Sequence, residues 1–538
     1  MATHDYPLLI KQLWHTPLAC APDQEIVYRD SLRYNYHDLW RRIGRLANSL
    51  HRSGVRPGDT VAVMDWDSHR YLECYFAVPM MGAVLMTVNT RLTPAQILYT
   101  LNHARADILL VHADFVPLVE EICKQLITVK KLVLIGDGLP PPPAGDLSFD
   151  GEYEEWIARG DVEYEFPDFD EHTRATTFYT TATTGDPKGV YYTHRQLVLH
   201  TLAAAAGLAS APAGQRFHRG DVYMPLTPMF HVHAWGVPYM ATMFGVKQVY
   251  PGRYAPDLLL RLIREEQVTF SHCVPTLLRM VLTAAKAQQA SLKGWKVVIG
   301  GSALPPALAQ MALDLGVDIF AGYGLSETAP VLTLAQLRPE HDGADAQARL
   351  AMLCRAGAPI PLVDLRIADE NMNALPHDGH SAGEIVVRAP WLTAGYLHDE
   401  AASERLWRGG YLHTQDIGVM DDRGYLRIRD RLKDVIKVAG EWVSSLELEH
   451  AIAHLPGVAE VAVIGVPDPR WGERPLALIV RTAPEATDEA AIAAKLHASC
   501  DAGTISKHAV LARIQFVDGI AKTGVGKIDK KALRSRYS

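Results

Sequence analysis

The sequence predicts an α/β protein with largely parallel sheets, followed by a small α+β domain near the C-terminal end. Short β-rich runs alternate with longer helical patterns through most of the chain, which is typical of helices packed on parallel strands. After about residue 425 the pattern changes, because a stretch dense in charge precedes a compact mixture of strand-like and helical segments. The length of 538 residues also exceeds that of a single core, so two or three domains are expected.

The strands of the large part are predicted from their apolar runs. Six short runs have the character of buried strands, namely residues 60–65, 83–90, 107–113, 130–137, 268–274 and 295–302. Alanine- and leucine-rich segments between them predict the helices. The proline-rich residues 138–146 predict an exposed loop between structural units.

The C-terminal domain is predicted from four segments. Residues 458–466, 474–480 and 511–518 resemble strands, and residues 488–500 resemble a helix. The boundary with the large part is expected around residues 431–433, inside the charged stretch "RIRDRLKDVIKVAG". A charged junction of this kind suits a hinge, although an ordinary solvated linker would have the same composition.

Composition and charge argue against several classes of protein. The net charge is −8, which argues against general attraction to nucleic acid or to an anionic membrane. The six cysteines are scattered and form no pair with zinc-ligand spacing. No apolar run approaches the ~18 residues of a membrane-spanning helix, and no secretion signal is found at the start. We therefore expect a cytoplasmic enzyme with no nucleic-acid partner and no membrane-spanning segment.

The stretch "TTFYTTATTGDPKGVYY", residues 176–192, carries the first chemical signal. Its hydroxyls and loop amides can donate hydrogen bonds to phosphate oxygens, and Lys188 adds a positive charge. The spacing does not fit the P-loop pattern of nucleotide-binding proteins. A polar surface loop with turn residues Gly185, Asp186 and Pro187 is the alternative interpretation.

This stretch resembles the phosphate loop of the adenylate-forming superfamily, which includes acyl-CoA synthetases, adenylation domains of peptide synthetases and luciferases. The usual pattern Y-T-S-G-T-T-G-x-P-K-G stands here as residues 179–189, "YTTATTGDPKG". The resemblance implies that Thr184 and Lys188 act in catalysis and that Thr184 also binds Mg²⁺. It implies that the ATP phosphates are bound by Thr180, Thr181, Thr183, Thr184, Gly185 and Lys188.

Two further motifs of the superfamily follow in the expected order. "AGYGLSETAP", residues 321–330, is similar to G-Y-G-x-T-E and implies that Tyr323 stacks on adenine. It also implies that Ser326 binds the α-phosphate and that Glu327 is a catalytic residue and holds Mg²⁺. "YLHTQDIG", residues 411–418, is similar to H-T-G-D, so that Asp416 would accept both ribose hydroxyls.

The charged stretch after residue 428 is the fourth match. The resemblance implies that Arg431 contacts the nucleotide and that Lys433 is the hinge. It places the CoA tunnel at Gly440, Glu441 and Trp442. "KTGVGKIDKKALR" resembles the superfamily's C-terminal motif, which makes Lys527 the adenylation lysine, with Lys522 as the second choice.

The implied architecture is a large adenylation domain of stacked sheets, residues 1–431, and a mobile C-terminal lid domain, residues 432–538. "PMFHVHAWGVPY" with "VVIGGSALP" and "GEWVSS" looks most like bacterial fatty-acyl-CoA synthetases and 3-methylmercaptopropionate–CoA ligases. In that branch the tryptophan, here Trp235, gates the acyl tunnel, although a core aromatic fits equally. The acyl-binding residues implied are His231, Trp235, Gly300, Gly301, Ser302 and Gly322. A metal site at His231 and His233 is disfavoured, because no third ligand has suitable spacing.

The resemblance implies an AMP-forming acyl-CoA ligase that uses ATP, Mg²⁺ and CoA. A carboxylate, either a medium- to long-chain fatty acid or a short thioether acid such as 3-methylmercaptopropionate, would form acyl-AMP and then a CoA thioester. An enzyme that loads a carrier protein is one alternative, and a catalytically weakened nucleotide- or acyl-binding homologue is another. The branch also suggests a homodimer.

Four residues depart from the superfamily patterns. Ala182 and Gln415 replace glycines, and Ser326 and Ala439 differ more mildly. If position 182 requires a positive φ, alanine costs on the order of 1 kcal/mol or more. We hypothesise a working enzyme whose phosphate loop is stiffer or binds ATP more weakly, which unchanged ATP kinetics in Ala182→Gly would refute.

Overall fold

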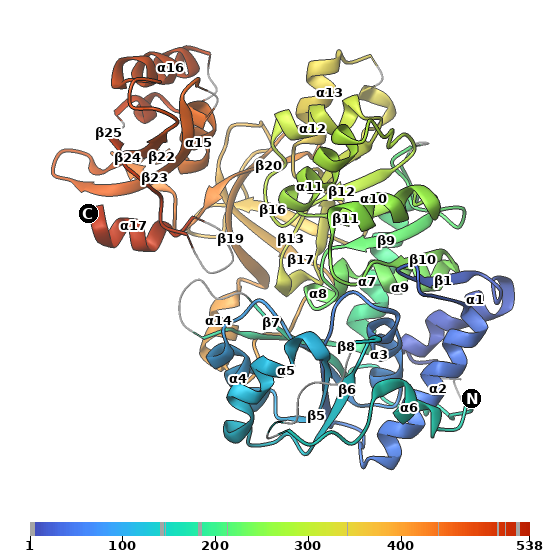
Figure 1. Cartoon of the computed structure of the whole chain (residues 1–538). Coiled ribbons are helices and arrows are strands. Elements are labelled where there is room, and N and C mark those ends of the chain that lie inside the picture. Colours follow the sequence, from blue (N-terminus) through green and yellow to red (C-terminus); the bar gives the residue numbers. More distant parts are fainter. Residues whose placement is uncertain are drawn as a thin grey trace, which may run out of the picture. The chain divides into compact units, whose positions relative to one another are not determined.

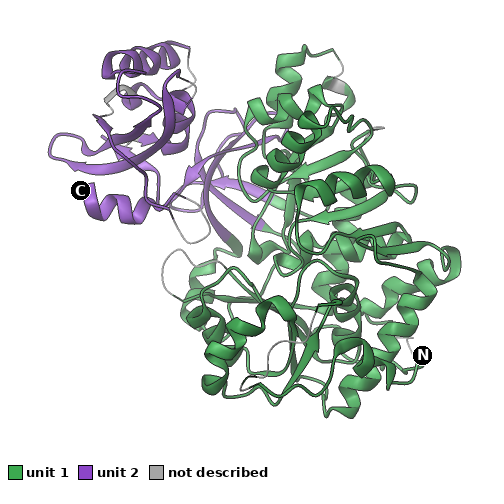
Figure 2. Cartoon of the chain, in the orientation of Figure 1, with its two compact units in different colours: residues 1–364, 388–412 green, residues 365–387, 413–538 purple. Residues whose placement is uncertain are grey.

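The computed structural model describes residues 6–139, 145, 147–180, 186–211, 214–341, 343–439, 441–453, 455–502, 505–511, 513–522 and 528–537. The chain divides into two compact units, which Figure 2 draws in different colours. The first comprises residues 1–364 and 388–412, and the second comprises residues 365–387 and 413–538. Figure 1 labels most of the helices and many of the strands.

The first unit contains a six-stranded sheet with the order β6-β5-β3-β4-β7-β8. All neighbours are parallel except β7 and β8, which form an antiparallel pair at the edge. Its strands are nearly all apolar and buried, as expected for a parallel sheet covered on both faces. Their bounds are β3 (Thr60–Met64), β4 (Val84–Thr87), β5 (Ala106–His112), β6 (Lys131–Ile135), β7 (Arg174–Tyr179) and β8 (Gly189–Thr193).

A nine-stranded sheet in the same unit has the order β15-β14-β13-β12-β11-β9-β10-β1-β2. The central strands are parallel, whereas β2, β14 and β15 pair antiparallel at the two edges. The bounds are β1 (Glu25–Tyr28), β2 (Leu32–Asn35), β9 (Val222–Leu226), β10 (Lys247–Tyr250), β11 (Phe270–Cys273), β12 (Lys296–Ile299), β13 (Asp318–Gly324), β14 (Val331–Leu334) and β15 (Ala358–Pro359). Strand β18 (Trp407–Arg408) pairs with residues 411–412.

Helices connect the strands, and several begin at residues that cap them. Asn35 and Ser68 accept hydrogen bonds from the first turns of α2 and α3, and Thr93 and Thr193 form capping boxes on α4 and α7. The helices of this unit are α1 (His15–Cys20), α2 (Tyr36–Arg52), α3 (His69–Met80), α4 (Pro94–His103), α5 (Val116–Ile122), α6 (Tyr153–Ala158), α7 (His194–Ala209), α8 (Val232–Trp235), α9 (Val237–Phe244), α10 (Pro256–Glu265), α11 (Pro275–Ala287), α12 (Pro306–Asp314), α13 (Ala346–Leu353) and α14 (Glu400–Leu406). Short 3₁₀ turns are η1 (Ile10–Trp14), η2 (Ala113–Phe115), η3 (Cys123–Gln125), η4 (Ser326–Thr328) and η5 (Pro339–His341).

Helix α8 is a single left-handed turn. Val232, His233, Ala234 and Trp235 have φ values of +49°, +53°, +46° and +58°, and Gly236 continues the turn at +73°. All four side chains are buried. A left-handed conformation costs a residue with a side chain about 1–2 kcal/mol, so four in succession persist only where the surrounding packing enforces them.

The second unit contains two sheets. One has the order β16-β17-β19, with β20 antiparallel to β19, and the other has the order β22-β21-β24-β23, with β25 parallel to β24. The strands are β16 (Asp364–Ala368), β17 (Gly383–Arg388), β19 (Tyr411–Met420), β20 (Leu426–Arg431), β21 (Ile436–Val438), β22 (Glu441–Val443), β23 (Val458–Asp468), β24 (Gly472–Arg481) and β25 (Arg513–Phe516). The helices are α15 (Ser445–Ala453), α16 (Glu489–Asp501) and α17 (Lys530–Tyr537), with the turn η6 (Lys507–Leu511).

The predicted fold class is confirmed. The six strands predicted in the large part correspond to β3, β4, β5, β6, β11 and β12, and the C-terminal segments correspond to β23, β24, α16 and β25. The loop predicted at 138–146 lies mostly outside the described residues. The domain boundary near residue 431 remains a prediction; β20 ends there, and the next strand begins at Ile436.

Candidate functional site

The predicted phosphate loop leaves the six-stranded sheet at the end of β7 and returns at the start of β8. Its base is closed by two hydrogen bonds, because Lys188 N–H donates to Thr180 Oγ1 at 3.2 Å and Thr180 N–H donates to the Lys188 carbonyl at 3.0 Å. Lys188 is exposed, and its Nζ lies 4.5 Å from the centroid of the Tyr396 ring. The predicted residues Thr181, Thr183, Thr184 and Gly185, and also Ala182, lie outside the described part of the chain.

The second predicted motif forms the end of β13 and the turn η4. Tyr323 is largely buried, at 9% exposure. Ser326 begins the turn, and its carbonyl accepts a hydrogen bond from Tyr192 Oη of β8 at 2.6 Å. Glu327 is partly buried, and its Oε1 accepts a hydrogen bond from Tyr396 Oη at 2.6 Å. The structure therefore brings Lys188 and Glu327 to opposite parts of the same tyrosine, the ring and the hydroxyl.

Tyr396 belongs to a segment, residues 391–397, that we call the clasp. Trp391 Nε1 donates to the Thr328 carbonyl at 3.0 Å, and Thr393 N–H donates to the Glu327 carbonyl at 3.1 Å. At its other end Leu397 N–H donates to the Gly189 carbonyl at 2.8 Å. The clasp thus fixes both the turn that carries Glu327 and the strand that begins directly after Lys188.

The clasp was not predicted from the sequence. The stretch "WLTAGYLHD", residues 391–399, lies between two matched motifs and contains few charged groups. Its signal in the sequence is weak, because its largely apolar residues are typical of an ordinary packed segment. Only the hydrogen bonds of the folded chain identify it.

The charges at this site are not paired with each other. Within the residues that the structure describes, neither Lys188 nor Glu327 makes an ion pair. Burial, followed by the charge of Glu327, raises the pKa of Tyr396 far above its ordinary range, so this hydroxyl stays protonated and donates at every physiological pH. An ammonium and a carboxylate are therefore both available to a ligand, one suited to phosphate and one to a hard cation.

The predicted acyl-binding residues lie at the ends of the nine-stranded sheet. A Cβ atom built on Gly300 would lie 2.8 Å from Trp235 Cη2 and 3.3 Å from the Gly322 carbonyl oxygen, so the absence of a side chain at Gly300 lets the indole pack there. Gly301 has a φ of +75°, and it is exposed together with Ser302. The structure thus brings Trp235, Gly300 and Gly322 together. His231 precedes the left-handed turn and is partly buried.

His272, which the sequence reasoning did not single out, lies against this group. Its ring centroid is 5.0 Å from that of Trp235, and it is hydrogen bonded to Tyr223 at 2.8 Å and to Thr227 at 3.1 Å. Burial lowers the pKa of His272 to about 3, and it lowers that of His233 to about 3 as well. Both imidazoles are neutral at pH 7, and His272, which lies against Trp235, therefore gives this wall no positive charge.

The predicted nucleotide residues of the second unit lie on β19 and β20. The Asp416 side chain is 5% exposed, and its Oδ1 lies 3.0 Å from Nε of Arg431, whose side chain is 55% exposed. Gln415, at the position of a superfamily glycine, has a φ of +59°. Its N–H donates to Glu384 Oε1 at 3.1 Å, which holds it in this strained conformation.

The remaining predicted residues follow β20. Lys433 lies in an exposed turn, and Trp442 is partly buried in the β21–β22 hairpin, with Lys437 Nζ 5.6 Å from its ring centroid. In that hairpin Glu441 pairs with Val438. Gly440 and Lys527 lie outside the described residues. Lys522, the second choice for the lysine, forms an ion pair with Glu460 at 2.5 Å.

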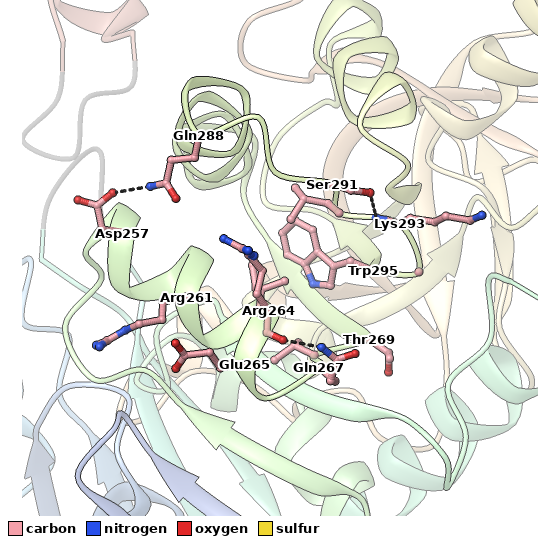
Figure 3. A pocket seen from close by; sticks show the side chains of 14 residues that line it. Asp257, Arg261, Arg264, Glu265, Gln267, Thr269, Gln288, Ser291, Lys293 and Trp295 are labelled. Carbon is pink, nitrogen blue, oxygen red and sulfur yellow. Dashed lines mark hydrogen bonds between the residues drawn. The ribbon is translucent and has the colours of Figure 1, made fainter.

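An open cavity of about 790 Å³ lies elsewhere in the first unit, between α10, α11 and the starts of β11 and β12 (Figure 3). Its walls include Arg261, Arg264, Lys293, Asp257 and Glu265, and thus carry both signs of charge. None of the predicted site residues lines it. No helix in the described ranges has both the length and the apolar character to cross a membrane.

Comparison with known proteins agrees with these motifs. Residues 15–397 match the family model of the AMP-binding enzymes, and residues 447–527 match that of the AMP-binding enzyme C-terminal domain. The chain is 40% identical to a long-chain-fatty-acid–CoA ligase of Thermus thermophilus over 508 residues, covering 94% of this chain and 90% of the relative. It is 39% identical to a 3-methylmercaptopropionyl-CoA ligase of Ruegeria pomeroyi over 502 residues, covering 92% of this chain and 90% of the relative.

Solved structures match over nearly the full length. A fatty acyl CoA synthetase of Mycobacterium tuberculosis superposes with a TM-score of 0.74 at 25% identity, covering 99% of this chain and 98% of the other. The ATP-bound structure of MatB from Rhodopseudomonas palustris superposes with a TM-score of 0.81 at 24% identity, covering 99% of each chain, and shows the same fold. The prediction of the superfamily is confirmed, and the chain belongs to the AMP-binding enzyme family.

Proposed function

We propose that this protein, an AMP-forming acyl-CoA synthetase, activates an uncharged aliphatic acid, either a medium- to long-chain fatty acid or a short thioether acid such as 3-methylmercaptopropionate. ATP and CoA are its other substrates. The observation that carries the ATP chemistry is the pair Lys188 and Glu327, which contact one tyrosine and leave both charges available.

In the first half-reaction the substrate carboxylate attacks the α-phosphate of ATP and releases pyrophosphate. Two anions must approach each other, so the protein has to neutralise and align charge rather than supply a strong base. We assign Lys188, Lys527 and the hydroxyls and amides of residues 180–185 to the phosphates. Ser326 binds the α-phosphate, Tyr323 stacks on adenine, and Asp416, with Arg431 beside it, binds the ribose.

The residues described here fit a magnesium ion that arrives with ATP. Mg²⁺ commonly takes one or two carboxylates from the protein, with phosphate oxygens and water as its other ligands. Glu327 is such a carboxylate, and the described residues contain no cluster of three or more acidic, histidine or cysteine side chains that would form a complete protein cage. We assign Glu327 and Thr184 as ligands; when bound, the ion would offset the negative charge of the phosphates.

In the second half-reaction the CoA thiolate attacks the acyl carbonyl, and AMP leaves. A thiol with a pKa near ~8.5 carries enough thiolate to react once it is positioned. We propose that Lys433 is the hinge of a C-terminal lid and that Gly440, Glu441 and Trp442 line the path of the pantetheine arm. Lys527 and the thiol need the same face of the acyl-adenylate, which is the physical reason for a lid that moves.

The wall formed by Trp235, Gly300, Gly322 and His272 supports an uncharged acyl tail. The imidazole of His272 is neutral, and Trp235 occupies the space that a side chain at position 300 would need. If the acyl tunnel passes Gly300, an acyl chain long enough to reach it has to displace the indole, whereas a shorter acid does not. The names of the relatives point to the same two classes, since they include long-chain, medium-chain and 3-methylmercaptopropionyl-CoA ligases.

The first experiment measures release of AMP and pyrophosphate from MgATP over a panel of acids, from propionate and 3-methylmercaptopropionate to long-chain fatty acids, each with and without CoA. The expected result is turnover that requires CoA and yields acyl-CoA. Pyrophosphate release that requires a phosphopantetheine carrier protein in place of CoA would favour the carrier-loading alternative. ATP binding without turnover of any acid would contradict the proposal and favour a catalytically weakened homologue.

The variant Trp235→Ala separates the two substrate classes. If the indole limits chain length, this variant raises kcat/KM for long acids relative to 3-methylmercaptopropionate, because it opens the space above Gly300. An unchanged preference would identify Trp235 as a core aromatic only. The suggested homodimer is tested separately by the mass of the protein in solution.

A further inference from the structure

We propose that Tyr396 is a positioning residue for ATP activation, acting through Glu327 and Lys188. The proposal rests on the proposed ATP chemistry of those two residues and adds a group that none of the four motifs contains. Tyr396 is neutral, and it contacts the carboxylate of Glu327 through its hydroxyl and the ammonium of Lys188 through its ring. Its effect is to keep both charges available and oriented until the nucleotide arrives.

The Tyr396 hydroxyl orients the carboxylate of Glu327. Tyr396 Oη donates to Glu327 Oε1 at 2.6 Å, a short hydrogen bond to a charged acceptor. Because the Glu327 carbonyl is also held, by Thr393 N–H at 3.1 Å, the backbone and the side chain of this residue are fixed by the same segment. One oxygen of the carboxylate is thereby oriented, while the other lone pairs stay open to a cation.

The Tyr396 ring restricts the position of the Lys188 ammonium group. Lys188 Nζ lies 4.5 Å from the ring centroid, within the range of a cation–π contact. The long side chain of an exposed lysine has many rotamers, and this contact restricts them without neutralising the charge. A direct ion pair between Lys188 and Glu327 would instead neutralise both charges. The ammonium would then be less available to phosphate, and the carboxylate less available to a divalent cation.

The backbone keeps the tyrosine in place. Residue 396 forms an antiparallel bridge with Val190, and Leu397 N–H donates to the Gly189 carbonyl at 2.8 Å. Gly189 follows Lys188 directly, so the ring and the lysine are carried by paired backbone segments. The arrangement is therefore a property of the fold, and substitution of the side chain alone should leave the segment in place.

Two variants distinguish the contribution of the Tyr396 hydroxyl from that of its ring. A second tyrosine, Tyr411, supplies a matched control. Tyr396→Phe removes only the hydroxyl, and Tyr396→Leu removes both contacts. Tyr411 makes the same two kinds of contact, because its Oη donates to Asp364 Oδ2 at 2.6 Å and its ring lies 5.5 Å from Cζ of Arg388. Tyr411, Asp364 and Arg388 are not predicted site residues. Tyr411→Phe therefore controls for the loss of a tyrosine–carboxylate hydrogen bond.

The experiment is calorimetric titration of each protein with ATP, without any carboxylic acid, once with excess EDTA and once with excess MgCl₂. Tyr396→Phe is expected to reduce the Mg²⁺-dependent gain in ATP affinity about tenfold and to change the affinity in EDTA less than about twofold, since a hydrogen bond to a charged group is lost. Tyr396→Leu should also weaken ATP binding in EDTA about threefold, through Lys188. Tyr411→Phe should match the wild type within about twofold.

A double-mutant cycle distinguishes positioning from a general loss of structure. In a Glu327→Gln background the effect of Tyr396→Phe on the Mg²⁺-dependent gain should disappear, because the carboxylate that the hydroxyl orients is gone. Equal behaviour of Tyr396→Phe and wild type, or equal effects of Tyr396→Phe and Tyr411→Phe, would overturn the proposal while leaving the ATP chemistry intact. A wild-type protein that binds no ATP under either condition would overturn both.

Discussion

The two units hold their predicted nucleotide carboxylates in different ways. In the first unit Glu327 accepts a hydrogen bond from the neutral Tyr396, whereas in the second unit Asp416 lies 3.0 Å from the guanidinium of Arg431. A tyrosine orients a carboxylate and leaves its charge uncompensated. An arginine compensates the charge and leaves the carboxylate as a hydrogen-bond acceptor. The first arrangement suits a group that must attract a cation, and the second suits one that must accept ribose hydroxyls in a nearly buried place.

The largest effect is expected where the uncompensated charge is removed. Glu327→Gln keeps the size and the acceptor oxygen of the side chain but not the negative charge. We expect kcat/KM for ATP in pyrophosphate release to fall on the order of 100- to 1000-fold, as for the loss of a group that stabilises developing charge. Asp364→Asn, at a second tyrosine-bound carboxylate, is the matched control and should change this value less than about twofold. Comparable losses in the two variants would remove the distinction.

Asp67 extends the comparison, because it too is held by a tyrosine. Its Oδ2 accepts from Tyr254 Oη at 2.5 Å, and its Oδ1 accepts from Met229 N–H at 2.8 Å. The pKa of Asp67 is raised to about 7, mainly because the carboxyl group is buried. The two hydrogen bonds and the charge of Arg91 lower this pKa, and the charge of Asp65 raises it, but burial has the largest effect. The folded state therefore keeps the proton up to about pH 7, whereas the unfolded chain releases it near pH 3.8.

The stability that this proton contributes is complete below about pH 4 and is lost as the pH rises towards 7. The side chain in Asp67→Asn does not titrate. The unfolding free energy of this variant minus that of the wild type should therefore increase from pH 5 to pH 8, by up to about 3 kcal/mol. Thermal unfolding at both pH values measures this. Asp161→Asn, at a side chain that is 74% exposed, is the control. The same difference between Asp67→Asn and wild type at both pH values would contradict the prediction.

A smaller effect is expected from the arginine of the second unit. Arg431→Ala leaves the Asp416 carboxylate, 5% exposed, without its guanidinium, which favours protonation of the carboxylate or its rotation away. Because Arg431 is itself half exposed, we expect only about a tenfold rise in KM for ATP, with kcat less affected. Arg431→Lys should recover part of the loss, since it restores the charge without the planar geometry. A full loss of activity in Arg431→Ala would place Arg431 in catalysis rather than in positioning.

The smallest effect concerns the backbone beside Asp416. Gln415 has a φ of +59°, which a glycine adopts without strain. Gln415→Gly should raise the free energy of unfolding by about 1 kcal/mol, while Gln415→Ala should not, because alanine keeps the same strain. Chemical denaturation of the three proteins tests this. A destabilised Gln415→Gly would mean that the Gln415 side chain contributes more than its conformation costs.

The buried strands of this molecule were predicted from the sequence better than the segments that link its motifs. Parallel strands such as β3 and β12 are buried on both faces, so their apolar runs identify them without knowledge of their neighbours. The clasp could not be found in this way, because the importance of Tyr396 depends on two residues that are 69 and 208 positions away in sequence. The positive φ of Gln415 was not predicted, although Gln415 was identified as standing at the position of a superfamily glycine.

The left-handed turn at residues 232–236 was not predicted and could not have been. Valine, histidine, alanine and tryptophan are unfavourable in that conformation, so their propensities point away from it. What enforces it is burial from all sides, including the contacts of His233 with the rings of Tyr75 and Phe178, at centroid distances of 5.8 and 5.1 Å. Tertiary packing of this kind overrides a local preference.

That turn has a consequence for laboratory evolution of the enzyme. A selection for heat resistance alone would reward glycine at position 234, because it relieves a strained backbone and removes only one methyl group, whereas positions 232, 233 and 235 would each lose a larger buried side chain. That replacement also loosens the segment that holds the Trp235 indole against Gly300. Libraries screened only for robustness would therefore drift towards broader acid preference, and a counter-screen with two acids of different length would be needed to retain discrimination.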